Sequence, residues 1–363
     1  MEIRGTPGLI LPGGGARAAY QVGVLKALAA VLDRDQLPFT AVAGISAGSI
    51  NATAVAQHAE DFVGAVQRLE GLWANMTSSD VFEVDLGNLR ALFSKEGQPL
   101  SLFDNTPLGN IVRRELDAPA LQQVIASGLL RGLAVTASNC TTGEATTFIQ
   151  ARSDAQTWHH DRRDSVLTVL GSEHLLASSA LPLLFPAQRV GDEFFVDGSL
   201  RMTAPLSPVI NLGADRILVI GVRYESRAGT IGEIHAPGIA EIGGYTLESL
   251  FAENLNADIE RAHQVNAMLE LIPWWRRRQL KRRRIEVMVI RPSQDVRTIA
   301  ARYSMKLPRT IRLFLRTLGG WGNEWRLPSY LLFEAPFTQA LIDLGYRDGL
   351  KHRPALEAFF SKE

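Results

Sequence analysis

The feature that most constrains this chain is a passage from a strand pattern to a helix pattern around Ser46. The apolar run over residues 39–43 is typical of a buried strand, and the small residues at 49–56 are typical of a helix. Gly44 and Gly48 flank the serine at two residues on either side, which is the pattern of a nucleophile elbow. Side chains at the two glycines would collide with the adjoining strand and helix. Packing alone also produces glycine-rich turns of this kind, so the stretch needs support from elsewhere in the chain.

A second glycine-rich turn lies earlier, after an apolar strand pattern at residues 8–11. Gly13, Gly14 and Gly15 form this turn, and an apolar-periodic helix pattern follows over residues 20–32. Backbone N–H groups in such a loop, together with the positive end of a helix dipole, bind anions. Two functions compete for it, because the loop matches a loose dinucleotide-binding pattern and could equally form an oxyanion hole.

The end of the second strand separates these two interpretations. A dinucleotide-binding fold needs an acidic residue there to hold the ribose, whereas this strand ends at Ser46. In a parallel sheet the glycine loop and Ser46 would meet at the carboxyl edge, where the sites of α/β proteins form. A P-loop is excluded because no Gly-Lys-Ser or Gly-Lys-Thr follows the glycines. The sequence therefore favours an oxyanion hole beside a nucleophile.

Together with two later stretches, these turns resemble the patatin-like phospholipase family. The four stretches are residues 13–17, residues 44–48, the run from residue 177 to residue 186, and the Asp-Gly pair at residues 197–198. The resemblance implies a three-layer α/β/α sandwich with a mostly parallel central sheet, and a Ser–Asp dyad that hydrolyses acyl esters. Ala18 departs from the family, whose loop usually continues with a glycine. Either the backbone at Ala18 is ordinary or the oxyanion loop is slightly re-aimed.

On this resemblance the catalytic pair is Ser46 as the nucleophile and Asp197 as the base that accepts its proton. A carboxylate suffices for this role if it is partly desolvated, because burial raises its pKa. A Ser–His–Asp triad is disfavoured, since the later histidines lack the context of a catalytic loop; they are His235, His263 and His352. The remaining positions are the oxyanion-hole residues Gly13, Gly14, Gly15 and Ala47, and the supporting residues Arg17, Gly44, Gly48 and Gly198. Arg17 either binds a substrate anion or forms a structural salt bridge.

Composition places the chain among ordinary globular proteins, with 46% hydrophobic and 21% charged residues and a formal net charge of zero. Its single cysteine, Cys140, excludes an intrachain disulfide. No signal-peptide pattern opens the sequence, and no apolar run reaches the length of about 18 residues that spans a bilayer, so we expect a cytoplasmic protein. Neither a cofactor nor a metal is expected, since the oxyanion hole is favoured over the loose dinucleotide pattern. No nucleic-acid partner is expected either, because no recognition motif for one occurs.

The zero net charge hides a basic segment. Residues 273–316 contain 14 Lys and Arg against two acidic residues, Glu286 and Asp295, which gives a formal charge of +12. We expect this segment to contact an anionic membrane at its periphery through tryptophans and arginines. The residues concerned are Trp274, Trp275, Arg276, Arg277, Arg278, Arg282, Arg283 and Arg284. A solvated helix end is the other interpretation.

Two parts are expected: a catalytic core over residues 1–225, and a mainly helical part over residues 226–363 that adds a late strand at about 285–290 and the basic surface. Residues 80–98 show no clear period and are expected to form a lid or wall of the site. The hypothesis is a serine acyl hydrolase that cleaves fatty-acyl esters of lipids or phospholipids, of the phospholipase A or lysophospholipase type. The alternatives are a carboxylesterase for soluble esters and a non-catalytic protein that binds a dinucleotide or a lipid.

Overall fold

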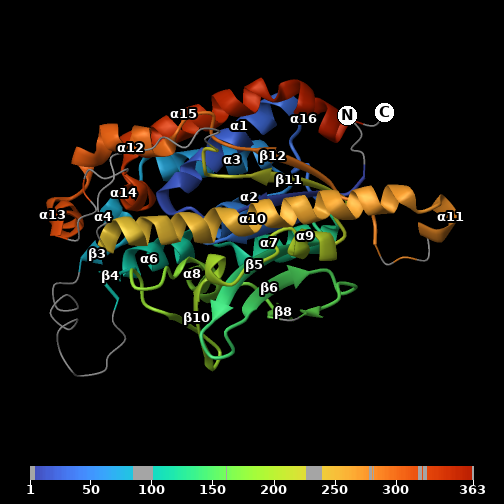
Figure 1. The fold of residues 1–363 in the computed structure, drawn as a ribbon, viewed down its shortest axis with the longest axis horizontal. Helices are drawn as coiled ribbons and strands as arrows, with labels where there is room; N and C mark the ends of the chain where they lie inside the picture. The colour runs from blue at the N-terminus through green and yellow to red at the C-terminus, as the bar shows by residue number, and fades with distance from the viewer. Residues whose placement is uncertain are drawn as a thin grey trace.

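A mostly parallel sheet forms the middle layer of the fold, and helices cover both of its faces (Figure 1). The computed structural model describes residues 5–84, 101–160, 162–225, 239–277, 280, 282–317, 321 and 325–361. Within these residues the main sheet has ten strands: β1 (Pro7–Leu11), β2 (Ala41–Ile45), β5 (Gly132–Asn139), β6 (Ala145–Ala151), β7 (His159–His160), β8 (Arg163–Leu167), β9 (Gln188–Val190), β10 (Glu193–Asp197), β11 (Arg216–Ile220) and β12 (Glu286–Ile290). The predicted α/β fold with a mostly parallel central sheet is confirmed.

The strand order brings the two glycine-rich turns together. The main path runs β12-β11-β1-β2-β5-β6-β8-β7, and the neighbours from β12 to β5 are all parallel. Because β1 and β2 are parallel neighbours, the loops that follow them meet at one edge of the sheet. β10 lies antiparallel along β5 and places Asp197 opposite Ala137. β9 and β10 pair antiparallel as a hairpin that ends at Asp197.

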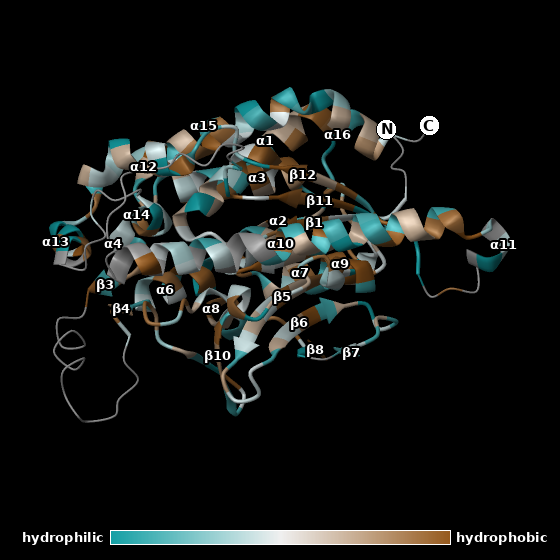
Figure 2. Cartoon of the chain, viewed as in Figure 1, coloured by the Kyte–Doolittle hydropathy of each residue, from teal (hydrophilic) through white to brown (hydrophobic). Residues whose placement is uncertain are grey.

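Burial on both faces explains why the central strands have continuous apolar sequences. In β1, Leu9 and Leu11 pack into the core on one face, whereas Ile10 packs into the core on the other. In β11 the same alternation separates Leu218 from Ile217. Parallel sheets covered by helices on both sides require apolar residues at successive positions. Figure 2 shows β11 and β12 as hydrophobic, whereas the outer helix α10 (Ile239–Leu271) carries both hydrophilic and hydrophobic residues.

The helices form the two outer layers. On the face that carries Leu9 the core is built by α1 (Ala19–Leu32), α2 (Ala47–Ala56), α3 (Phe62–Ala74), α6 (Thr106–Glu115), α7 (Ala118–Ser127), α8 (Ser172–Ser179), α12 (Val296–Tyr303), α13 (Arg309–Thr317), α14 (Arg326–Leu331), α15 (Ala335–Lys351) and α16 (Arg353–Phe360). The other face is covered by α9 (Ser207–Asn211) and α10. In Figure 1, α10 runs across the molecule, and α15 lies over α1.

The basic segment does not form one surface, because its two halves lie far apart. The short helix α11 (Trp274–Arg277) follows α10 at one end of the molecule, and α13 lies at the opposite end (Figure 1). Of the expected lid, the structure describes α4 (Ser78–Val81) and β3 (Glu83–Val84), which pairs with β4 (Phe103–Asp104). The remainder of that segment, His235, Arg278 and the side chains of Trp274 and Arg277 lie outside the described residues.

Candidate active site

Ser46 lies between β2 and α2, and its backbone has the strained conformation of a nucleophile elbow. Its φ of 55° and ψ of −135° are rare for a residue with a side chain. Neighbouring backbone atoms lie so close to Gly44 and Gly48 that neither position has room for a side chain. A Cβ at Gly48 would overlap the carbonyl oxygen of Leu11, and a Cβ at Gly44 would overlap the backbone of Ser49. The turn therefore fixes Ser46 at the N-terminus of α2 and beside the end of β1.

A second serine holds the elbow in place. The backbone N–H of Ser46 donates to the Ser178 hydroxyl at 2.9 Å, and that hydroxyl donates to the carbonyl oxygen of Thr136 at 2.7 Å. Ser178 is fully buried on α8, so these bonds connect the elbow to α8 and β5. The sequence places Ser178 in the family-like run that begins at residue 177. It gives no sign of these partners, which are remote along the chain.

Asp197 ends β10 with its carboxylate buried near the elbow. Its Oδ1 accepts a hydrogen bond from the Ser199 N–H at 2.9 Å, and its own N–H donates to the carbonyl oxygen of Ala180 at 2.8 Å. Burial raises the pKa of Asp197 to about 6, while interactions with the Ser46 hydroxyl and with Ser199 act to lower it. Among the described residues, the buried Oδ2 has no partner in hydrogen-bond geometry. Gly198 follows, where a Cβ would overlap the carbonyl oxygen of Thr136.

The glycine loop lies beside the elbow. Gly13 is buried in it, and Gly14 has a φ of 173° and a ψ of 10°. Gly15 has a φ of 53° and lines the same cavity as the elbow serine. A Cβ at Gly15 would overlap the carbonyl oxygen of Tyr330, whereas a Cβ at Gly14 would lie 2.6 Å from a methyl group of Val222. The loop is therefore tightly packed against Val222, just after β11, and against Tyr330 of the C-terminal part.

A buried polar network anchors the glycine loop to α2. The Asn51 amide donates to the carbonyl oxygen of Ala18 at 3.1 Å and to Gln21 Oε1 at 2.9 Å. Gln21 donates in turn to the carbonyl oxygen of Pro12 at 2.8 Å, and Trp73 Nε1 donates to Asn51 Oδ1 at 2.8 Å. Ala18 has a φ of −65°. Of the two expectations for this departure from the family, the ordinary backbone is the one observed.

Arg17 forms a buried salt bridge, which is one of the two alternatives that the sequence left open. Its side chain is 2% exposed and forms a salt bridge with Glu248 of α10 at 3.2 Å. The Arg17 Nε donates to the Ser329 hydroxyl at 2.9 Å, and the guanidinium stacks over the Tyr330 ring at 3.9 Å. Arg326 also pairs with Glu248, at 3.2 Å. The glycine loop is thereby joined to α10 and α14.

An apolar cavity of about 40 Å³ opens at Ser46, and it is called here the inner chamber. Gly15, Ser46 and Ala47 form one end. The remaining walls are mainly apolar: Ile50, Leu72, Trp73, Met76, Val81, Leu108, Ile111, Ser179, Leu181, Phe185, Tyr330, Leu331 and Phe333. Three of these residues follow α13 in the chain, so the C-terminal part forms a wall of the cavity beside the elbow.

The histidines do not complete a triad in the described part of the chain. His263 lies on α10, and His352 Nδ1 contacts the carbonyl oxygen of Asp348 at 2.8 Å. His174 is buried, and its ring stacks edge-on against Phe148 with centroids 4.6 Å apart. The described residues also hold no cluster of three or more His, Cys, Asp or Glu side chains that could bind a metal. No described helix is both long and apolar enough to cross a membrane.

Comparison with solved structures gives distant likenesses. VipD from Legionella pneumophila is 14% identical with a TM-score of 0.37, and the match covers 94% of this chain and 67% of VipD. The type III effector ExoU is 14% identical with a TM-score of 0.36, covering 98% of this chain and 54% of ExoU. ExoU in its complex with SpcU from Pseudomonas aeruginosa is 15% identical with a TM-score of 0.29, covering 72% and 53%. These scores indicate too little shared structure for a comparison of sites.

Comparison of sequences gives the family. A search of curated proteins found no match. The sequence model of the patatin-like phospholipase family matches residues 9–210, which include the glycine loop, the elbow and Asp197. This match spans more than half of the chain, and it agrees with the resemblance that the motifs indicate. The chain belongs to the patatin-like phospholipase family.

Proposed function

We propose that the chain hydrolyses fatty-acyl esters of lipids or phospholipids, with Ser46 as the nucleophile and Asp197 as the general base. The observation that carries this proposal is the pairing of a serine in a strained elbow with a fully buried carboxylate whose pKa is raised to about 6. At neutral pH such a carboxylate is about nine-tenths ionised and is a stronger base than an exposed aspartate. It can therefore accept the serine proton without a histidine.

The reaction runs in two steps. In the first step Ser46 Oγ attacks the ester carbonyl carbon, Asp197 accepts the hydroxyl proton and then returns it to the leaving alcohol, and an acyl-enzyme forms. In the second step water attacks the acyl-enzyme and gives a proton to Asp197, which passes it to Ser46 as the fatty acid leaves. The N–H groups of Gly13, Gly14, Gly15 and Ala47 would stabilise the oxyanion in both steps.

The inner chamber supports a lipid rather than a small soluble ester as the substrate. Its walls beyond the elbow are almost entirely apolar, and burying an alkyl chain there is favourable by about 0.8 kcal/mol per methylene. An apolar lining of this kind is compatible with a phospholipase A or lysophospholipase activity. The competing carboxylesterase function predicts no gain in rate when the acyl chain is lengthened.

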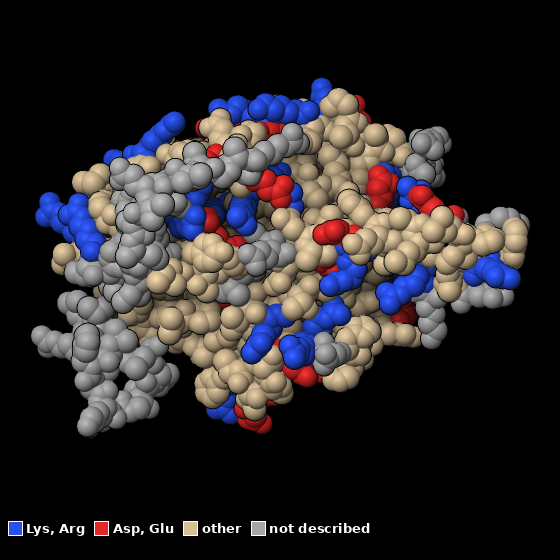
Figure 3. Space-filling model, viewed as in Figure 1, with Lys and Arg blue, Asp and Glu red and all other residues tan. Residues whose placement is uncertain are grey.

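Peripheral membrane contact is the second part of the proposal, and it rests on fewer residues than the basic segment contains. Figure 3 shows Lys and Arg in separate groups on this face of the molecule. Arg283 donates to the carbonyl oxygens of Ile210 and Ala214, and Arg284 lies 3.8 Å from Glu270. Trp275, Arg276 and Arg282 are exposed near the end of α10, and we propose that they face an anionic bilayer. Their basic and aromatic chemistry suits its interface.

Labelling with a fluorophosphonate, followed by peptide mapping, tests the assignment. We expect the label on Ser46, and we expect the substitutions Ser46→Ala and Asp197→Asn to abolish hydrolysis of a phospholipid. Ser127→Ala, at the exposed end of α7, is the matched control. Absence of label on Ser46 in the folded protein would favour the non-catalytic alternative. Full activity of Asp197→Asn would refute the dyad.

A further inference from the structure

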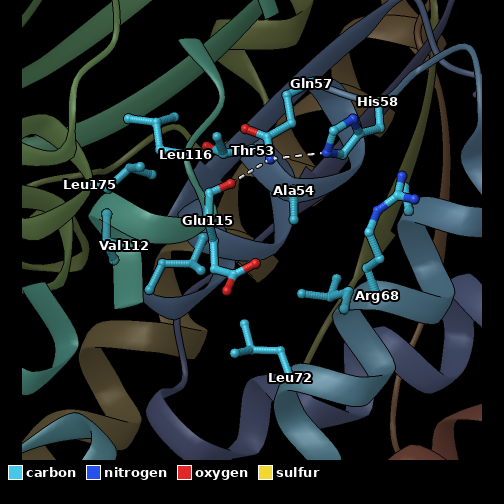
Figure 4. Close-up of a pocket in the computed structure, with 13 residues that line it drawn as sticks. Thr53, Ala54, Gln57, His58, Arg68, Leu72, Val112, Glu115, Leu116 and Leu175 are labelled. Atoms are coloured by element: carbon cyan, nitrogen blue, oxygen red, sulfur yellow. Dashed lines mark hydrogen bonds between the residues drawn. The ribbon is translucent and has the colours of Figure 1, made fainter. Parts of the chain in front are cut away.

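A second cavity, called here the outer chamber, lies behind the inner chamber and is built by the same four helices. It has a volume of about 60 Å³ and is lined by residues of α2, α3, α6 and α8 or their ends. Figure 4 shows Thr53, Ala54, Arg68, Leu72 and Val112 among the side chains around it. Residues of α2, α3, α6 and α8 also line the inner chamber, so both cavities lie between the same four helices.

Two aliphatic side chains separate the chambers. Ile50 and Leu72 line both of them, one from α2 and one from α3. Each is partly exposed, as is Ala54 one turn further along α2. Ile50 lies one helical turn beyond Ser46, and Gln57 at the far end lies about 16 Å from Ser46 at a rise of 1.5 Å per residue. An acyl chain that extends from Ser46 along α2 therefore meets Ile50 and Leu72 first and the outer chamber next.

The polar groups around the outer chamber are already bonded within the protein. The Gln57 amide donates to the carbonyl oxygen of Glu115 at 2.7 Å and accepts from the Asp117 N–H at 2.9 Å. The Thr53 hydroxyl donates to the carbonyl oxygen of Ser49 within α2 at 2.8 Å.

Two charged side chains also line the chamber and are paired: Arg68 with Asp61 at 3.3 Å, and Glu115 with Arg114 at 2.8 Å. His58 Nε2 lies 3.5 Å from the Gln57 amide. The other walls are apolar and include Leu69, Leu116 and Leu175. An alkyl group fits such a lining, whereas a polar ligand would find few unsatisfied partners.

Size limits what the inner chamber holds alone. At about 10–15 Å³ for each water-sized occupant, it has room for about three or four, and the outer chamber for about four to six. A methylene is similar in volume to a water molecule, so a long acyl chain exceeds the inner chamber.

We propose that the outer chamber is a second acyl-chain subsite, which receives the distal part of a long chain whose ester lies at Ser46. Ile50 and Leu72 form a gate between the two chambers. This inference rests on the proposed function, because it places the ester carbonyl at the elbow.

Chain-length profiles of two opposed variants test the proposal. The measured quantity is the ratio of kcat/KM for p-nitrophenyl palmitate to that for p-nitrophenyl butyrate. Ala54→Phe, which fills the outer chamber, should lower this ratio by about tenfold or more, since each displaced methylene loses several-fold in binding. Ile50→Ala, which opens the gate, should raise it. The control is Gly71→Phe, next to Leu72 on α3, where a Cβ meets no atom within 4 Å; its ratio should equal that of the parent.

Labelling of Ser46 by fluorophosphonates with short and long alkyl chains gives a second readout. The rate ratio for the long and short probes should change in the same directions as the ester ratio. Unchanged ratios in both Ala54→Phe and Ile50→Ala, with the folded variants still labelled by the short probe, would overturn the outer chamber as a subsite. Failure of the parent protein to hydrolyse or be labelled by any member of either series would instead refute the proposed function.

Discussion

Asp197→Asn should make the protein more stable at neutral pH while removing its activity. The pKa of Asp197 rises from 3.8 to about 6 on folding because the carboxyl is fully buried. The folded state therefore holds this proton more tightly than the unfolded state, and the stability of the parent falls as the pH rises through this window. At 1.36 kcal/mol per pKa unit the full cost is about 3 kcal/mol above pH 7. Asparagine keeps an acceptor for the Ser199 N–H and carries no charge, so it avoids this cost.

Urea unfolding of parent and variant between pH 5 and pH 8 measures the effect. About half of the cost is present at pH 5, so the advantage of Asp197→Asn should grow by about 1.4 kcal/mol by pH 8. Asp295→Asn is the control: burial acts to raise the pKa of Asp295, but its hydrogen bonds to Arg297 and the charge of Arg297 outweigh burial and lower it. Its titration lies below this window, so its difference from the parent should stay flat. A flat difference for Asp197→Asn as well would refute a buried, ionised carboxylate.

Two further predictions concern the glycine loop and the basic surface. Gly15→Ala should lower kcat by about 10²-fold with little change in KM, because its positive φ and the Tyr330 carbonyl force the loop to move and misdirect an oxyanion donor. Gly14→Ala should cost less, because its Cβ would press on the Val222 side chain rather than on a backbone carbonyl, and its φ is not in the left-handed range. A rise in KM alone for Gly15→Ala would contradict the oxyanion role. Replacing Arg276 and Arg282 by Gln should weaken binding to anionic vesicles by about tenfold or more. Binding of the parent to these vesicles should also weaken at high salt. Co-sedimentation measures both effects, with neutral vesicles as the control. Equal binding of parent and variant would leave these arginines as a solvated surface.

Local sequence patterns sufficed for three of the parallel strands, β1, β2 and β12, and for the two glycine-rich turns. An apolar strand, a Gly-x-Ser-x-Gly turn and a helix of small residues constrain one another over a short stretch, so Ser46 could be placed at the end of β2 from the sequence. The resemblance to a family added the pairing of Ser46 with Asp197, which the local sequence patterns alone do not indicate.

Long-range contacts account for what the sequence did not reveal. Arg17 meets Glu248, Ser329 and Tyr330, all more than 200 residues away, and no periodicity reports such a pairing. The hydrogen bond from Ser46 to Ser178 is invisible for the same reason. Charge counted along residues 273–316 suggested one surface, but the chain carries its two halves to opposite ends of the molecule (Figure 1).

The bonds of Arg17 to α10 and α14 limit how this protein can be recombined with its relatives. A chimaera joined after residue 225 would keep the elbow, Asp197 and the glycine loop, yet leave a buried guanidinium without Glu248 and Ser329. An unpaired buried charge costs several kcal/mol, which is a large fraction of the stability of most domains. Exchange of the C-terminal part would therefore succeed only with a donor that supplies matching partners for Arg17. For the same reason, Arg17 restricts which substitutions α10 and α14 can accept during evolution.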